Sequence, residues 1–317
     1  MDDAHPLIDW NLLEGPHLDG REDGCVVHQD IAATEFLVDG RRGLLHALNI
    51  THIHRNGQTL PSVIADLPGD PVHRVGIDVQ GHDAVVNLVA ILHGSADAFE
   101  QVHVRLPEML ARACAETGVR RLVHVSALGA DEQGPSMYQR SKGRGEAALQ
   151  AAAARGDIDL TLLQPSVIFG RDDRFINLFA QLQRVFPVMP LAGADTRFQP
   201  VWVDDVAAAL VHALEHRRAI GQTYELAGPE VLSLRELVQL AGRHIGCPRP
   251  VIALPHAVGW LQALAMEWLP GPTLMSRDNL ASMQVDNVAS GRHPDLSALG
   301  VSAPRRLAQV FPPSVRG

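Results

Sequence analysis

Two residues of this sequence, Tyr138 and Lys142, have the types and the spacing needed for proton transfer. They lie four positions apart in a segment that predicts a helix over residues 137–154, so both occupy one face about a turn apart. A free phenol has a pKa near ~10, and a cation beside it favours the phenolate and lowers that pKa. We therefore expect Tyr138 to act as a general acid and base on a carbonyl or hydroxyl compound, with Lys142 tuning it.

The use of basic residues makes this pair more specific than its motif alone. Of the 27 lysines and arginines only Lys142 is a lysine, and the two tyrosines are Tyr138 and Tyr224. The alternative is a chance surface pair, a coincidence expected in under about one chain in a hundred of this composition. A compact ammonium with three donors also suits ribose hydroxyls better than a planar guanidinium does. The composition thus favours a functional pair.

Size and composition limit the class of protein. The chain has 317 residues, of which 46% are hydrophobic, enough for one large α/β domain or for one domain with a smaller appendage. A net charge of -9 argues against a nucleic-acid partner. The cysteines Cys25, Cys114 and Cys247 are widely spaced, which indicates a reducing compartment and no disulfide framework. The acidic start and the lack of a long apolar run predict a cytoplasmic protein, or one peripheral to a membrane.

The middle of the chain alternates between strand and helix patterns. Apolar runs at 84–89, 121–125 and 160–163 predict buried strands, and residues 105–117 and 137–154 predict the helices between them. This alternation predicts a parallel sheet with helices on both faces.

The pattern loosens beyond residue 170. We expect further short strands at 201–203 and 223–226, and further helices at 175–185, 205–215, from Ser233 onward, and at 257–269. Ser233 and Glu236 have the spacing of a capping box. The helix at 257–269 carries Trp260 and Trp268, which suit either a buried core or docking on a membrane surface or partner.

Three segments carry a resemblance to a known superfamily. The stretch from Arg121 to Ala130, followed by residues 138–142, resembles the atypical or extended short-chain dehydrogenases. The segments from Pro165 to Asn177 and from Gln199 to Val206 resemble one branch of them. That branch holds the dehydrogenase-like accessory subunit of respiratory complex I (alpha subcomplex subunit nine) and its bacterial relatives. The likeness covers about residues 78–290.

The resemblance implies a Rossmann-type domain over residues 34–228 that holds NADP or NAD, and a small, mostly helical substrate or partner part over residues 229–317. It implies that Tyr138 and Lys142 flank the nicotinamide ribose and that Asn87 lies near the cofactor. The backbone of Pro165, Ser166 and Val167 is implied to face the nicotinamide carboxamide.

Strand positions give these assignments independent support. Asn87, Ser126 and Pro165 fall at or just beyond the carboxyl ends of predicted parallel strands, where ligands bind in doubly wound sheets. Each has a simpler interpretation too: a turn residue for Asn87, a strand cap for Ser126 and a strand terminator for Pro165. The superfamily usually places a serine or threonine after this strand to bind the substrate oxygen, and Ser126 is our third catalytic candidate. In many relatives that residue lies one or two positions further on, where this chain has Ala127 and Leu128.

The N-terminal region is atypical. Residues 1–33 show no clear period, and the HxH of His52 and His54 lacks the partners of a metal site, so we expect no metal. The best candidate for the phosphate-binding turn has Gly40 and Gly43, but His46 stands at the third glycine position. Two explanations stay open: a diverged cofactor half, or a segment that is not ancestral, for example after an upstream frame shift.

Three functions follow from these observations. The first is an NAD(P)-dependent oxidoreductase or epimerase acting on a small or quinone-like carbonyl compound. The second is a non-catalytic, NADPH-holding accessory or assembly subunit of respiratory complex I, peripheral to the inner membrane. The third is a protein that has lost nucleotide binding with its phosphate loop.

Overall fold

The computed structural model describes residue 79 and residues 82–171, 173–268 and 273–314. It also gives the backbone of five short strands nearer the N-terminus, β1 (Val26–Val27), β2 (Leu44–Leu45), β3 (Ile53–Arg55), β4 (Gln58–Thr59) and β5 (Leu67–Pro68). The predicted glycine turn at Gly40 and Gly43 lies outside the described residues.

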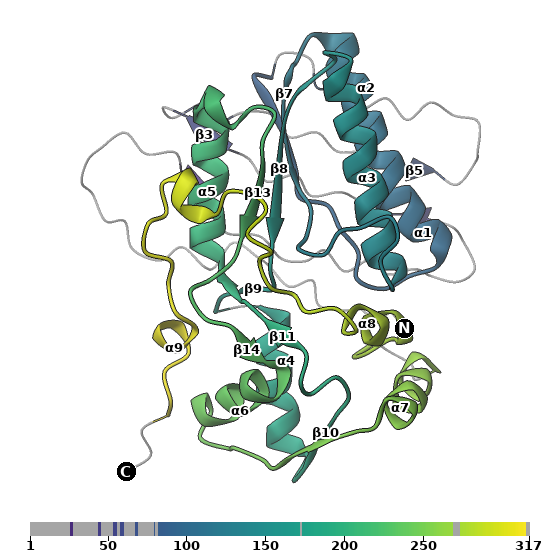
Figure 1. Cartoon of the computed structure of the whole chain (residues 1–317), viewed down its shortest axis with the longest axis vertical. Coiled ribbons are helices and arrows are strands. Elements are labelled where there is room, and N and C mark those ends of the chain that lie inside the picture. The colour runs from purple at the N-terminus through teal and green to yellow at the C-terminus, as the bar shows by residue number, and fades with distance from the viewer. Residues whose placement is uncertain are drawn as a thin grey trace, which may run out of the picture.

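Four parallel strands form the sheet that carries the predicted site residues (Figure 1). Their order is β13 (Thr223–Leu226), β8 (Asp159–Pro165), β7 (Arg121–Val125) and β6 (Ala84–Asn87). The register places Asn87 beside His124 and Val125 beside Leu163. Strands β7 and β8 are almost wholly buried, as continuous apolar runs predict for strands covered on both faces.

Helices cover both faces of this sheet (Figure 1). Helices α2 (Leu106–Thr117) and α3 (Met137–Ala154) pack on one face, and α5 (Val203–Glu215) packs on the other. Successive residues of β7 serve the two cores, since Leu122 packs toward α2 and α3 whereas Val123 packs toward α5. The predicted parallel sheet with helices on both faces is confirmed.

The helix before β7 starts earlier than predicted. It runs without a break through α1 (Ala96–Glu100), a π-helical turn η2 (Gln101–Arg105) and α2, and ends at Gly118 in the left-handed conformation, as expected for a helix cap. Pro107 explains the widened turn, because it has no N–H for the His103 carbonyl four residues earlier. Sequence periodicity predicted only α2, the regular α-helix that follows the π-helical turn.

Helix α3 has the predicted bounds. Ser136 caps it, with its hydroxyl accepting from the Gln139 backbone N–H while the Gln139 side chain reaches back to Ser136. Gly145 lets α3 approach η2 so closely that a Cβ there would overlap the His103 carbonyl oxygen. The His103 carbonyl, which Pro107 cannot serve as a donor, therefore faces a position where α3 has no side chain.

A second group of elements lies below the sheet in Figure 1 and has its own core around Phe179, Phe198 and Leu237. Its helices are α4 (Arg174–Val185), α6 (Leu234–His244), α7 (His256–Trp268), α8 (Arg277–Ser282) and α9 (Leu307–Val310). Its paired strands are β9 (Ile168–Phe169) with β12 (Val201–Trp202), β10 (Met189–Leu191) with β15 (Val251–Ala253), and β11 (Arg197–Phe198) with β14 (Leu232–Ser233). Single turns η3 (Arg217–Ala219) and η4 (Leu296–Leu299) complete the described structure. Helices α6 to α9 lie in the predicted helical part at residues 229–317, whereas α4 and β9 to β12 join the same group from earlier in the chain.

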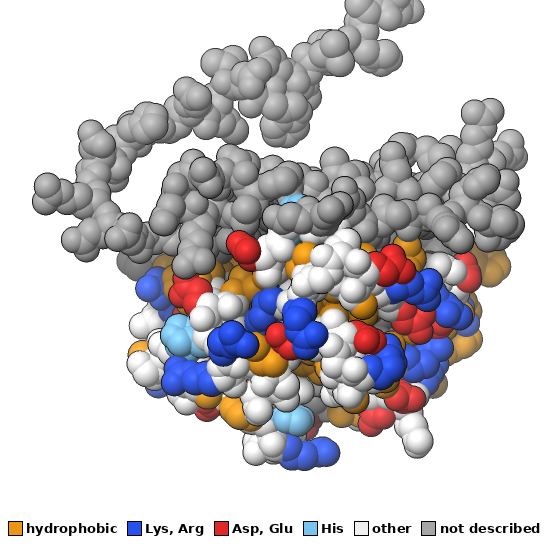
Figure 2. Space-filling view, turned by 90° about the horizontal axis from the view of Figure 1, so that it is seen from above, with side chains coloured by type: hydrophobic (Ala, Val, Ile, Leu, Met, Phe, Trp, Pro, Cys, Tyr) orange, Lys and Arg blue, Asp and Glu red, His pale blue; other side chains and the backbone are white. Residues whose placement is uncertain are grey.

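The surface fits the composition. Figure 2 shows basic and acidic side chains interspersed over the described part of the face seen from above. Within the described ranges no helix combines the length and the apolar character that a membrane crossing needs.

The close approach of α3 to η2 gives a test of the fold. We expect Gly145→Ala to lower the free energy of unfolding by about 1–3 kcal/mol, because the added Cβ pushes η2 away from α3. In a helix without such a neighbour the same change stabilises by roughly 0.5–1 kcal/mol, so the sign is informative. Urea unfolding measures it, with Gln150→Ala on the exposed side of α3 as control. An unchanged or increased free energy for Gly145→Ala contradicts the close approach.

Candidate active site

Lys142 lies inside the protein at the carboxyl end of β7. Its side chain is 1% exposed, and its ammonium donates to the Val125 carbonyl oxygen at 3.0 Å. Burial lowers the pKa of Lys142 to about 8, against the opposing effect of the Glu146 carboxyl. An ammonium has three donors, and the Val125 carbonyl is its one acceptor among the described residues.

Tyr138 lies one helical turn before Lys142 and is half-buried. Its ring meets the His103 ring edge-on, with centroids 5.4 Å apart and planes at 84°. Burial, and to a lesser degree Glu146, raises the pKa of Tyr138 to about 12. The lowering of this pKa by Lys142 that the spacing predicts is not found, because burial dominates. The phenol is therefore a neutral proton donor in this structure.

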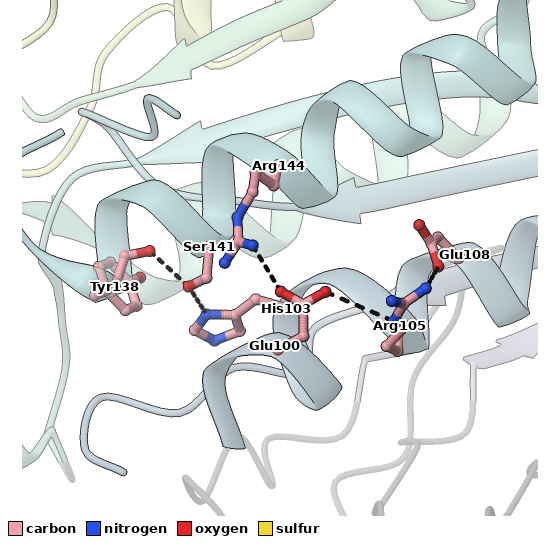
Figure 3. Close-up of polar contacts among 7 residues, drawn as sticks. All are labelled: Glu100, His103, Arg105, Glu108, Tyr138, Ser141 and Arg144. Atoms are coloured by element: carbon pink, nitrogen blue, oxygen red, sulfur yellow. Dashed lines mark hydrogen bonds and ion pairs between the residues drawn. The ribbon is translucent and has the colours of Figure 1, made fainter. Parts of the chain in front are cut away.

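A buried histidine connects Tyr138 to the π-helical turn (Figure 3). The Ser141 hydroxyl donates to the Tyr138 carbonyl at 2.9 Å, so it accepts from His103 Nδ1 at 2.8 Å. His103 Nε2 accepts from the Ile91 backbone N–H at 3.0 Å. With one nitrogen donating and the other accepting, His103 is neutral, and burial together with Lys142 lowers its pKa to about 3.

Ion pairs on the outer side of α3 reinforce this contact (Figure 3). Arg144 in α3 pairs with Glu100 at 2.7 Å, and Arg105 in η2 bridges Glu100 at 3.6 Å and Glu108 at 3.1 Å. These side chains are partly exposed, so each pair adds little stability. Together they join α1, η2 and α2 to the helix that carries Tyr138.

Glu146 extends the site one turn beyond Lys142. Its carboxyl is buried and accepts from the Gln164 side chain at 2.9 and 3.0 Å. Burial raises the pKa of Glu146, while the Ser126 hydroxyl, Gln164 and Lys142 act in the opposite direction. Ser126 is buried directly after β7, as predicted, and lies beside this carboxyl. Its substrate contact stays a prediction.

Asn87 ends β6 and orients a second buried histidine. Its side-chain oxygen accepts from the Val89 backbone N–H at 3.1 Å, which leaves its amide nitrogen to donate to His124 Nδ1 at 3.0 Å. His124 therefore carries its proton on Nε2, which has no hydrogen-bond partner among the described residues. Burial, with Lys142 and His103, holds the pKa of His124 well below its usual range.

The segment after β8 has its donors engaged within the protein. The Ser166 N–H donates to Leu226 O at 2.9 Å, and the Val167 N–H and the Ser166 hydroxyl donate to the Asn287 side-chain oxygen at 3.1 and 2.6 Å. Pro165 has no N–H. The segment thus offers carbonyl oxygens and no spare backbone N–H to a carboxamide, and its cofactor contact stays a prediction.

Comparison with known proteins gives the family. Residues 54–227, just over half of the chain, match the NAD dependent epimerase/dehydratase family. The chain belongs to this family. Rossmann-type NAD binding is the family's character, and the predicted likeness to the extended short-chain dehydrogenases is confirmed.

Relatives of this family member include subunits of respiratory complex I. The chain is 30% identical to NADH dehydrogenase (ubiquinone) 1 alpha subcomplex subunit 9, mitochondrial, of Arabidopsis thaliana, over 66% of this chain and 54% of that protein. It is 32% identical to the protein of the same name in Mus musculus, over 70% of this chain and 59% of that protein. The chain therefore spans a little over half the length of these relatives, and the predicted complex I branch is confirmed.

The fold also matches solved structures of this family. A nucleoside-diphosphate-sugar epimerase from Staphylococcus aureus superposes with a TM-score of 0.55 at 16% identity, covering 73% of this chain and 76% of that one. At this identity the match describes the fold alone.

Several residues of this candidate site were missed from the sequence. Glu146 could have been found, because it continues the i, i+4 spacing of Tyr138 and Lys142. His103 and Asn287 have no local signal, since their partners are distant in the chain. No cluster of metal-ligating side chains occurs among the residues described.

The two buried histidines predict a pH-dependent stability. Their folded pKa values lie below the ordinary 6.5, so as pH falls the unfolded chain takes up protons first and the fold is destabilised. We expect a loss of about 1.4 kcal/mol per pH unit for each histidine below pH 6.5, continuing toward pH 3 for His103. Urea unfolding between pH 7 and pH 4 measures this slope. His103→Gln should reduce this slope; an equal slope in the two proteins would overturn the assignment.

The single lysine allows a direct titration. In protein carrying carbon-13 lysine, the one side-chain resonance should shift with a midpoint near pH 8, because burial penalises the ammonium. A midpoint at the ordinary 10.5 or above would mean that Lys142 is hydrated and outside the sheet edge.

Proposed function

We propose that this protein binds a nicotinamide dinucleotide and transfers hydrogen to or from a carbonyl compound, with Tyr138 as the proton donor and Lys142 as the ribose-holding cation. One observation carries the proposal: the only lysine of the chain is buried with its ammonium at a strand end, one helical turn from a half-buried tyrosine. Burying a lone cation is costly, so its retention there favours a function.

The residues fit a dinucleotide. Lys142 keeps donors beyond the one on Val125, which suit ribose hydroxyls. Asn87, Ser126 and Lys142 gather at the carboxyl ends of β6 and β7, where doubly wound sheets bind ligands. NAD and NADP both satisfy the proposal, and the titration below separates them.

The protonation states favour reduction of the carbonyl. When bound, the nicotinamide ring supplies or accepts the hydride. Tyr138 holds its proton at neutral pH and can pass it to a developing alkoxide oxygen. Lys142, with a pKa of about 8, is mostly charged at neutral pH and favours negative charge on the phenol once that proton has left.

A small or quinone-like carbonyl compound is the proposed substrate class. Leu88 and Leu92, on the loop after β6, are exposed, and so is Leu274 beside α8. The Asn279 side chain donates to the Leu92 carbonyl, so this loop and α8 lie together. Exposed leucines beside the tyrosine helix suit an apolar compound better than a charged one.

A non-catalytic role in respiratory complex I is the second candidate. The relatives named as complex I subunits favour it, and so does α7, where Leu261 is 60% and Trp268 83% exposed. Exposed aromatic and aliphatic side chains on a helix suit a partner or a membrane surface. In this role the protein holds NADPH as a structural element at the inner membrane, whereas the first role suits a cytoplasmic enzyme.

Binding and turnover test the first proposal together. NADH and NADPH are titrated against the protein by nicotinamide fluorescence, and NADPH oxidation is followed with a short-chain ubiquinone analogue and a panel of ketones. Lys142→Met should weaken dinucleotide binding at least roughly 10-fold, while Tyr138→Phe should leave binding nearly intact and reduce turnover roughly 100-fold or more. Tyr224→Phe, in the core of β13, is the matched control and should change neither.

The outcomes separate the candidates. Binding without turnover, together with co-purification with complex I, favours the accessory subunit. Binding of neither dinucleotide leaves only a protein that has lost its nucleotide. Full turnover by Tyr138→Phe contradicts the assigned proton donor.

A further inference from the structure

The first turn of α3 is held by a residue far along the chain. Asp278, in α8, accepts from the Met137 backbone N–H at 2.6 Å and from the Tyr138 backbone N–H at 3.0 Å. The Ser136 hydroxyl accepts from the next N–H, that of Gln139, at 3.0 Å. A helix leaves its first N–H groups without internal partners, and a carboxylate there also meets the positive end of the helix dipole. Asp278 therefore satisfies the donors of Met137 and of Tyr138 itself.

Arg277, the residue before Asp278, joins α8 to α7. The Arg277 backbone N–H and Nε donate to the Glu267 carboxylate at 2.7 and 2.9 Å, and the guanidinium lies over the Trp260 ring at 5.4 Å. Figure 1 places α8 between α7 and the lower end of α3. Consecutive residues of α8 thus bind in two directions, Arg277 to α7 and Asp278 to the tyrosine helix.

A second route joins α8 to Tyr138. Asn279 donates to the Leu92 carbonyl at 3.4 Å, in the loop after β6. The same loop is held by His103 through the Ile91 N–H, and the His103 ring packs on Tyr138. Tyr138 is therefore enclosed from two sides, by Asp278 on its backbone and by His103 on its ring.

We propose that Asp278 is a positioning residue for Tyr138, and that its carboxylate holds the phenol in place by tying the first turn of α3 to the α7–α8 unit. The inference rests on the proposed function, in which Tyr138 donates the proton. Without the Asp278 carboxylate the N–H groups of Met137 and Tyr138 lose their acceptor, so the first turn loosens beside the remaining Ser136 cap and Tyr138 moves with it. Lys142, one turn further in, is held by the Val125 carbonyl and stays.

The exposure of the phenol can be measured without substrate or cofactor. Tyr224→Phe leaves Tyr138 as the only tyrosine. After a rapid jump to about pH 10.5, the fast rise of tyrosinate absorbance reports phenol that is hydrated before the protein unfolds. The Tyr224→Phe parent should show almost no fast rise, since the pKa of Tyr138 is about 12. Adding Asp278→Ala should give over half of the full amplitude, because a hydrated phenol has a pKa near ~10.

A matched control distinguishes positioning from general loss of stability. Asp286 accepts from the Arg197 backbone N–H at 2.9 Å and from Arg197 Nε at 2.8 Å, so Asp286→Ala also removes two hydrogen bonds from the C-terminal segment. It should give no fast rise, and Asp278→Glu should restore much of the protection. No fast rise in Asp278→Ala, or an equal one in Asp286→Ala, overturns the proposal. If Asp278→Ala does not fold, Asp278→Asn keeps one acceptor and must give a smaller rise; none at all counts against the proposal.

Kinetics separate this inference from the function on which it rests. Asp278→Ala should lower kcat roughly 10- to 100-fold while the Kd for NADH or NADPH stays within about two-fold. If the parent protein binds neither NADH nor NADPH, the proposed function is wrong, but the absorbance experiment still tests whether Asp278 positions Tyr138. If the parent protein turns over substrate, and Asp278→Ala shows the same kcat and no fast rise in absorbance, then the positioning role of Asp278 is wrong and the proposed function stands.

Discussion

The burial of one ammonium group constrains the rest of this site. Lys142 is out of water, and its one described acceptor is a strand carbonyl, that of Val125. Its charge helps keep His103 and His124 neutral by lowering their pKa values, and it lowers the pKa of the buried Glu146 carboxyl against the effect of burial. Burial is the larger cause of each of these shifts, and the ammonium couples the groups to one another, so a change at Lys142 alters the pKa of all three.

Room for this arrangement comes from the backbone. Pro107 interrupts the hydrogen bonding of the preceding helix, the chain widens into a π-helical turn, and His103 sits in that turn. On the facing helix Gly145 supplies the space that the His103 carbonyl requires. A proline on one helix and a glycine on the other, 38 residues apart, together bring the imidazole to the tyrosine ring.

Local patterns were sufficient for the elements and for the central pair. Apolar runs predict β7 and β8, alanine-rich periodicity predicts α3 to the residue, and the capping box at Ser233 is present as expected. Periodicity failed at residues 96–104, because a π-helical turn breaks the 3.6-residue repeat. It also gave the wrong direction for the pKa of Tyr138, because spacing places Lys142 on the same face but does not reveal the burial that raises this pKa. Contacts of Asn287 and Asp278 join segments more than 100 residues apart, for which one sequence carries no signal.

The first turn of α3 is held by Ser136 and by Asp278, so it is fully formed only after the chain has been synthesised as far as α8. Tyr138 emerges from the ribosome 140 residues before Asp278, the partner of its backbone N–H. During that interval the sheet edge and Lys142 can form from local segments, whereas the tyrosine end of α3 waits for a contact of very high sequence separation. A chain cut short before α8 would therefore keep its lysine in place and leave its tyrosine unfixed.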